Sequence, residues 1–331
     1  MRLYLDQKDW ISLARVRLQK ADRAERRAAA ALAKGFGTGR LIVPFSESHV
    51  LETGARAQPS KRLDVAMTIM LLSKRHALAP VHQVWVQEAD AFLARRFGAP
   101  VAGEPEPFGK GVAFALGIPE DKLTLPWAAD ASEAEVAMVE MYAIAEPGRA
   151  GLSGYDIERQ ARWDALVDTI TSTSKHLVKD RERYNEHEQD RLAAVTLTML
   201  GNELIGRAIG YDVHDAYLDL LREEGPWAVI REIPSLAVMT ELLRVRYPDV
   251  QAPWTTHDYH DVRFLSTALA YCDAVCPDRR WGELALRSEH IAIARSSSRR
   301  AGMRCRRRSR GCSGDSDGRG RPREGHAQGL T

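Results

Sequence analysis

Short apolar runs alternate with amphipathic segments along the first 78 residues. Residues 2–6 and 40–45 contain apolar runs of the length typical of buried strands. Apolar residues recur at helical spacing over residues 9–35, which predicts one long helix after the first run. Ser46 is a favourable N-cap for a helix after the second run, and residues 61–77 predict a further helix. This order of strand, helix, strand and helix indicates an α/β fold with a parallel sheet.

The pattern changes to helices alone from about residue 79 to residue 250. The predicted helices are residues 81–98, 132–146, 155–210, 213–225 and 235–248. Strand and helix signals then return, with a helix beginning at Asp261, a strand over 273–276 and a helix from Asp278. We therefore expect the α/β core to be interrupted by a large all-α insertion.

This pattern divides the chain into four parts. Residues 1–78 and 251–294 are the two halves of the core, and residues 79–250 are the helical insertion. Residues 295–331 form a tail with 11 arginines against three acidic residues, so the tail carries +8 and the rest of the chain −6, giving the net +2. The tail has few large apolar residues, so disorder is expected. A frameshift in a GC-rich gene is our preferred interpretation of its Arg/Ser/Gly composition, and a genuine basic arm that binds nucleic acid is the alternative.

Composition restricts the class of protein. The chain is 44% hydrophobic and 28% charged, which is typical of globular proteins in solution. No apolar run approaches the ~18 residues of a membrane span, and the first residues lack a secretory pattern, so we expect a cytoplasmic protein with no membrane partner. Four cysteines are too few and too unevenly placed for a disulfide framework.

Four acidic residues are expected at one edge of the sheet. Asp6 ends the first strand, and Asp278 follows the last one. The carboxyl ends of parallel strands share an edge, and the helices carrying Glu52 and Asp261 begin there. Crowded carboxylates repel one another unless a cation neutralises them, and hard oxygen ligands suit Mg²⁺ or Mn²⁺. A metal site that activates water against a phosphodiester is one chemistry open to this arrangement. Helix caps and solvated surface are the alternative roles.

These residues resemble the PIN domain, a family of metal-dependent ribonucleases that includes many bacterial toxins. The matching segments are RLYLDQKDWISL, LIVPFSESHVLETGA and DVRFLSTALAYCDAVCPDRRW, in the family's order. The resemblance implies a PIN-like three-layer core with a short parallel sheet and an endoribonuclease activity. It places the catalytic and metal-binding acids at Asp6, Glu52, Asp261 and Asp278, with Asp273 as a further metal ligand. The implied cofactor is Mg²⁺ or Mn²⁺, and the expected partners are RNA, an antitoxin-like protein and a second copy of the chain.

The resemblance covers residues 1–75 and 255–290, less than half of the chain. Gln7 stands where the family has a small Thr or Ser, the helical region is much longer than in a small toxin, and the family's final strand has no counterpart. A catalytically inactive PIN-like binding or scaffold protein, or a truncated copy, is therefore the alternative function. A nucleic-acid binder that uses its basic tail is a third.

Several residues near the acids have two interpretations. Arg62, Arg279 and Arg280 are expected either to contact the RNA backbone or to be solvated surface. Asp258 is expected to cap the helix that contains Asp261, and Trp281 to be a packing anchor. The remaining candidate, His49, lies one helical turn before Glu52. Its side chain is expected either to lie at the surface or to contact a phosphate.

Overall fold

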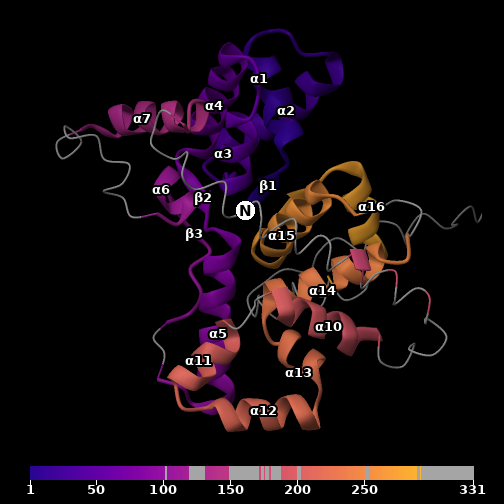
Figure 1. Ribbon diagram of the computed structural model, residues 1–331. Helices are drawn as coiled ribbons and strands as arrows, with labels where there is room; N and C mark the ends of the chain where they lie inside the picture. Colours follow the sequence, from indigo (N-terminus) through magenta and orange to yellow (C-terminus); the bar gives the residue numbers. More distant parts are fainter. Residues whose placement is uncertain are drawn as a thin grey trace, which may run out of the picture. The chain divides into compact units, whose positions relative to one another are not determined.

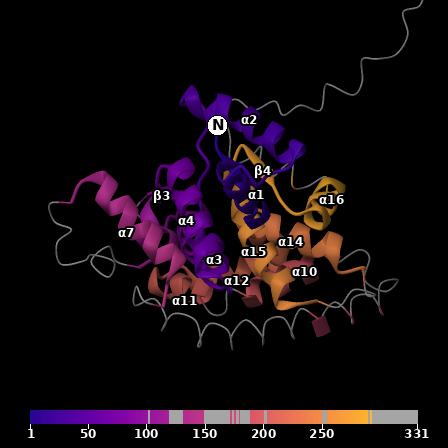
Figure 2. The same cartoon turned by 90° about the horizontal axis from the view of Figure 1, so that it is seen from above.

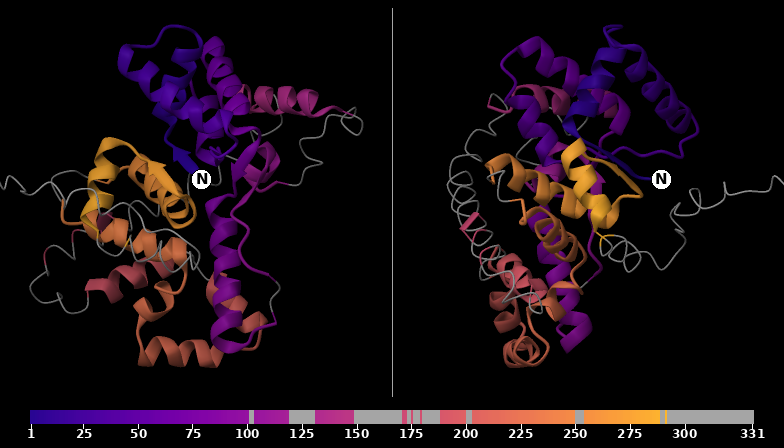
Figure 3. Two further views of the ribbon diagram at one scale, coloured as in Figure 1. Left: turned by 180° about the vertical axis from the view of Figure 1, so that it is seen from behind. Right: turned by 90° about the vertical axis from the view of Figure 1, so that its right-hand side faces the viewer.

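The first and last strands of the chain form a parallel pair. In the computed structural model, β1 (Leu3–Leu5) pairs with β4 (Ala274–Cys276), with Leu3 opposite Ala274 and Leu5 opposite Cys276. Figure 3 shows β4 returning beside the chain's N-terminus. The structure describes residues 1–100, 103–118, 131–148, 188–199, 203–249, 254–288 and 291, with four isolated positions between 171 and 179. The predicted basic tail, residues 295–331, lies outside the described residues.

A second pair of strands is antiparallel. It joins β2 (His76–Leu78) to β3 (Phe108–Lys110). Both strands were missed: β2 begins inside the helix predicted over 61–77, and β3 lies inside the region predicted to be all-α. The cause is local for β2, because Lys74 has a left-handed backbone conformation (φ 51°) that ends the helix before this strand.

The segment predicted as the second strand links the two pairs without being a regular strand. Arg2 and Ile42 form one parallel bridge, and Phe45 and Ala77 form another. The Leu3 N–H donates to the Ile42 carbonyl (2.9 Å), and the Leu78 N–H donates to the Phe45 carbonyl (2.7 Å). Pro44 lies between these bridges and has no N–H to donate, so a continuous ladder cannot form. The expected strand is therefore reduced to two isolated bridges.

The first predicted helix is two helices. They are α1 (Gln7–Arg17) and α2 (Arg23–Gly37), separated by Gln19 with φ of 60°. Asp22 caps α2 by accepting the Glu25 N–H (2.8 Å), while the Glu25 carboxylate accepts the Asp22 N–H (2.9 Å). This reciprocal capping box is a start signal inside the apparent helix, and the periodicity alone did not show it.

One core lies around β1 and the helices within residues 1–73 and 111–145. After α2 come α3 (Glu47–Gly54), α4 (Pro59–Ser73), α6 (Gly111–Leu116) and α7 (Glu133–Ala145). Figure 1 shows α4 and α7 side by side, and they pack against each other directly. The buried apolar residues of this core include Leu3, Leu5, Trp10, Val43, Phe45, Val50, Ile69, Val112, Leu116 and Ile144. Residues 111–145 thus share a core with α1, α3 and α4 rather than with the later helices.

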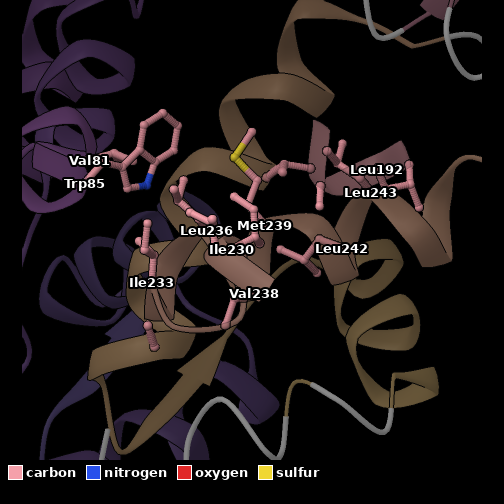
Figure 4. Packing of buried hydrophobic residues seen from close by; sticks show 14 of the residues in the cluster. Val81, Trp85, Leu192, Ile230, Ile233, Leu236, Val238, Met239, Leu242 and Leu243 are labelled. Carbon is pink, nitrogen blue, oxygen red and sulfur yellow. The ribbon is translucent and has the colours of Figure 1, made fainter. Parts of the chain in front are cut away.

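A second core unites the later helices. They are α5 (Val81–Phe97), α10 (Glu188–Met199), α11 (Glu203–Gly210), α12 (His214–Glu223), α13 (Pro226–Ile230), α14 (Pro234–Arg246), α15 (Thr256–Tyr271) and α16 (Arg279–Arg287). Helix α14 packs against both α15 and α10, and Figure 2 shows α15 beside it. Trp85, Leu236, Met239 and Leu242 contribute to the packed interior shown in Figure 4. The protein is therefore mixed α/β and mostly helical, with a small parallel sheet.

Helix α15 begins earlier than predicted. Thr255 is its N-cap, and the Asp258 carboxylate accepts the Thr255 N–H (3.0 Å), which confirms the capping role of Asp258. Asp261 consequently lies in the second turn of the helix instead of at its start. The error arose because the helix was assigned from its apolar residues, whereas its first turn is polar.

None of the described helices is by itself both long and apolar enough to cross a membrane. Only a bent pair, Asp190–Thr198 and Glu203–Gly210, meets the length and composition requirement jointly, across a 79° bend.

A buried carboxyl joins three helices of the second core. Glu88 on α5 is 1% exposed and accepts hydrogen bonds from the Ser235 N–H (3.1 Å) on α14 and the Tyr271 hydroxyl (2.5 Å) on α15. Burial raises the pKa of Glu88 to about 7, against the opposing effect of these hydrogen bonds. The folded protein therefore favours the protonated form of this group.

We expect this buried group to make stability fall as the pH rises. The pKa of Glu88 is raised from 4.5 to about 7, so its contribution to the free energy of unfolding is lost between these pH values, by on the order of 3 kcal/mol. Glu88→Gln still accepts both hydrogen bonds but carries no charge. Urea unfolding at pH 5 and pH 8 is expected to show the variant gaining stability relative to the native chain as the pH rises. Exposed Glu223→Gln is the control, and an equal pH response in all three proteins would contradict the interpretation.

Candidate functional site

The parallel strand pair places two aspartates at the same edge. Asp6 directly follows β1, and its N–H donates to the Cys276 carbonyl at the end of β4 (3.1 Å). Asp278 follows β4 and caps α16, its Oδ1 accepting the Trp281 N–H (2.7 Å). Burial and the nearby charge of Asp278 raise the pKa of Asp6, opposed by the Gln7 N–H and the Lys8 ammonium. The two carboxylates are therefore close enough to repel each other.

Glu52 on α3 and Asp261 on α15 join this pair. The pKa of Glu52 is raised to about 7, chiefly by burial and in part by the charges of Asp6 and Asp261. The pKa of Asp261 is also raised to about 7, chiefly by burial and in part by the charges of Asp278 and Asp6, while a hydrogen bond from Trp281 opposes the rise. The structure thus brings Asp6, Glu52, Asp261 and Asp278 together from four different elements. Each of the four interacts unfavourably with at least one other.

His49 holds α3 against the first strand. Its Nδ1 accepts the Ser46 N–H (2.9 Å), so Nε2 is the protonated nitrogen and donates to the Leu5 carbonyl (2.9 Å). Burial lowers the pKa of His49 to about 4, which keeps the ring neutral. The side chain is 1% exposed, so it does not contact a phosphate. It instead positions Glu52, one turn later on the same helix.

Gln7 provides a second link between α1 and α3. Its Nε2 donates to the Thr53 hydroxyl (2.9 Å). Gln7 directly follows Asp6 in the chain, and Thr53 directly follows Glu52. Among the described residues, Gln7 Oε1 and Asp9 Oδ2 are buried oxygens with no hydrogen-bond partner. From the sequence, Gln7 was notable only as a departure from the PIN-domain pattern. Its position between an apolar strand and the buried Trp10 was the signal that it is buried.

Asp273 does not belong to this group. It lies at the amino end of β4, whereas Asp278 follows the carboxyl end. Its Oδ2 accepts the Arg2 N–H (2.6 Å) and lies 3.9 Å from the N-terminal ammonium. The strand separates Asp273 from the edge where the other acids meet, so this arrangement gives no support to the expectation that Asp273 binds the metal. Asp273 fastens the start of the chain to β4.

The three candidate arginines have different surroundings. Arg62 pairs with Glu146 and so joins α4 to α7, with only 16% of its side chain exposed. Arg280 donates to Asp258 (2.6 Å), which ties α16 to the start of α15. Arg279 is 92% exposed and pairs with Glu283 on its own helix (2.9 Å). Arg62 and Arg280 therefore have structural partners on other elements, although 41% of the Arg280 side chain is exposed, and Arg279 is the most exposed of the three.

Lys8 is a basic residue that the sequence analysis missed. Its ammonium donates to the Pro277 carbonyl (2.8 Å) and lies 3.8 Å from Asp6 Oδ2. It connects the first turn of α1 to the loop before Asp278, and half of its side chain is exposed. Lys8 therefore brings a positive charge to the acidic group at the sheet edge.

The oxygen donors suit a divalent cation, although they are not arranged as a closed coordination sphere. No group of three or more His, Cys, Asp or Glu side chains within the described ranges is close enough together to hold a metal ion. The four carboxylates nevertheless repel one another, and two further buried oxygens lie in the first turn of α1. A hard cation relieves such repulsion and prefers oxygen ligands. The donor chemistry therefore fits Mg²⁺ or Mn²⁺.

Comparisons of the chain with protein-family models, with curated proteins and with solved structures found no match. The chemistry of the site must therefore be argued from its own residues.

Proposed function

We propose that the protein is a metal-dependent endoribonuclease with a PIN-like core. The observation that carries this proposal is the meeting of Asp6, Glu52, Asp261 and Asp278 from four elements, where burial and the neighbouring carboxylates raise the pKa values of Asp6, Glu52 and Asp261. An assembly of repelling, partly buried carboxylates costs stability, and a bound divalent cation offsets that cost. The choice of RNA as substrate comes from the resemblance to PIN domains.

The acids and the neighbouring bases would have distinct tasks. Bound Mg²⁺ or Mn²⁺ supplies an activated water and neutralises charge on the phosphodiester. Asp6 and Asp278, held by the strand pair, would bind the cation together with Glu52 and Asp261. Lys8 and Arg279 are exposed cations beside these acids and would contact backbone phosphates. An antitoxin-like protein and a second copy of the chain remain the proposed protein partners, and the cytoplasm the proposed location.

Binding without hydrolysis is the second candidate function. It is favoured by one observation, that no three acidic or other ligating side chains in the described part of the chain are within coordinating reach. A PIN-like scaffold would bind RNA or a protein partner through the same face but would not cleave. A cleavage assay with added metal separates the two functions.

Removal of one acid is expected to abolish cleavage without unfolding the protein. Asp278→Asn keeps a good N-cap for α16 but removes the charge, so the metal-dependent rate should fall by about 100-fold or more. Asp6→Asn is expected to have the same effect. The measurement is cleavage of a labelled RNA in Mn²⁺, with circular dichroism to confirm the fold.

Asp273→Asn is the matched control, since it makes the same substitution at the other end of the same strand. This variant should lose some stability through the Arg2 hydrogen bond but cleave at the native rate. Equal loss of cleavage in Asp273→Asn and Asp278→Asn would contradict the assignment, as would undiminished cleavage by Asp6→Asn.

Divalent metal should stabilise the protein more at high pH than at low pH. The pKa values of Glu52 and Asp261 are raised from 4.5 and 3.8 to about 7, so both groups favour the protonated form in the folded state. Without metal, their contribution to stability is lost as the pH rises through this range. Metal binding needs the ionised forms, so Mg²⁺ at about 100 times its dissociation constant should raise Tm by roughly 5 °C at pH 8.

The same addition should raise Tm much less at pH 5.5, because both carboxyls are then protonated. Thermal scans with MgCl₂ and with NaCl of equal ionic strength provide the measurement and its control. A Tm shift of equal size at both pH values would show that the cation acts elsewhere on the molecule.

A further inference from the structure

Trp281 is in contact with two of the four acids at once. Its backbone N–H donates to Asp278 Oδ1 (2.7 Å), and its indole Nε1–H donates to Asp261 Oδ2 (2.9 Å). The residue lies in the first turn of α16, whereas Asp261 lies on α15. One residue therefore links the carboxylates of two helices and two chain segments.

The indole is held rigidly. Trp281 is 1% exposed and packs against Trp254, with ring centroids 6.4 Å apart, so its ring cannot turn without breaking the local core. Arg246 lies over the other ring, 4.8 Å from the Trp254 centroid, and Arg280 next to Trp281 is bonded to Asp258. The nitrogen that bonds Asp261 consequently has a fixed position relative to α15.

Each of these two hydrogen bonds uses only one of the two oxygens of its carboxylate. Asp261 Oδ2 accepts the indole N–H and Asp278 Oδ1 accepts the backbone N–H, so Trp281 occupies neither Asp261 Oδ1 nor Asp278 Oδ2. A carboxylate fixed through one oxygen has a defined direction for the other. Groups that bond metal-binding carboxylates in this way commonly decide how well the ligands are oriented.

We propose that Trp281 is a positioning residue that orients Asp261 and Asp278 for a divalent cation. This inference rests on the proposed metal-dependent function and adds to it the residue that aligns two of the four ligands. Trp281 does not touch substrate, because its side chain is buried. Its effect passes through the two carboxylates alone.

Trp281→Phe tests the proposal, since it keeps an aromatic ring in the core but removes the indole N–H. Isothermal titration of Mn²⁺ into the full chain should show affinity reduced by about 10-fold or more, the usual effect of losing such a partner. The Mn²⁺ concentration for half-maximal cleavage should rise by the same factor, while KM for RNA stays unchanged. Trp254→Phe is the matched control, because Trp254 belongs to the same cluster but donates no hydrogen bond to either acid among the described residues.

A second measurement does not depend on the folding of a variant. In the native chain labelled with ¹⁵N-tryptophan, addition of Mg²⁺ should shift the indole N–H resonance of Trp281 more than that of Trp254. One result would overturn the positioning role alone: the native protein binds Mn²⁺, Trp281→Phe binds it with an affinity within twofold of the native one, and Mg²⁺ causes no selective shift of the Trp281 resonance. Native protein that neither binds Mn²⁺ nor responds to Mg²⁺ would overturn the proposed function together with it.

Discussion

The site depends on the pairing of β1 with β4, two strands of three residues each that lie about 270 positions apart in the chain. This pairing sets Leu5 opposite Cys276, and only then do Asp6 and Asp278 emerge at the same edge. Closure of so long a loop carries a conformational cost that grows slowly with length, so the rest of the core must supply the stability. Trp10, Phe45 and the neighbouring apolar side chains bury β1 on its helical side, and the ion pair of Asp273 with the chain's first residue secures the opposite end.

Buried like charges oppose this folding energy. Burial is the largest cause of the raised pKa values of Glu52 and Asp261, and the charge of Asp6 adds to both, so the packed state disfavours their ionised forms. Neutral His49, Gln7 and Trp281 hold the backbone and carboxyl groups in place without adding charge. The clustered carboxylates thus reduce stability at this edge, as is common where proteins concentrate charge.

Local signals in the sequence predicted most of what positions the acids. The strand before Asp6, the cap at Ser46 and the strand before Asp278 were recognisable from apolar runs and capping residues, and all three are present. Errors occurred where a backbone property overrode periodicity. Pro44 reduced an apolar run to isolated bridges, and the polar first turn of α15 moved Asp261 from the helix start to its second turn. The roles of Asp273 and Arg62 needed tertiary contacts, because a sequence does not tell which end of a strand or which neighbouring helix a charged side chain will meet.

The long separation between β1 and β4 has a consequence for synthesis of the protein. A ribosome must translate beyond Asp278 before either half of the acidic edge can meet the other, so the growing polypeptide carries only Asp6 and Glu52 for most of its production. The four carboxylates that the proposed function assigns to the cation therefore come together only when nearly the whole core has left the exit tunnel.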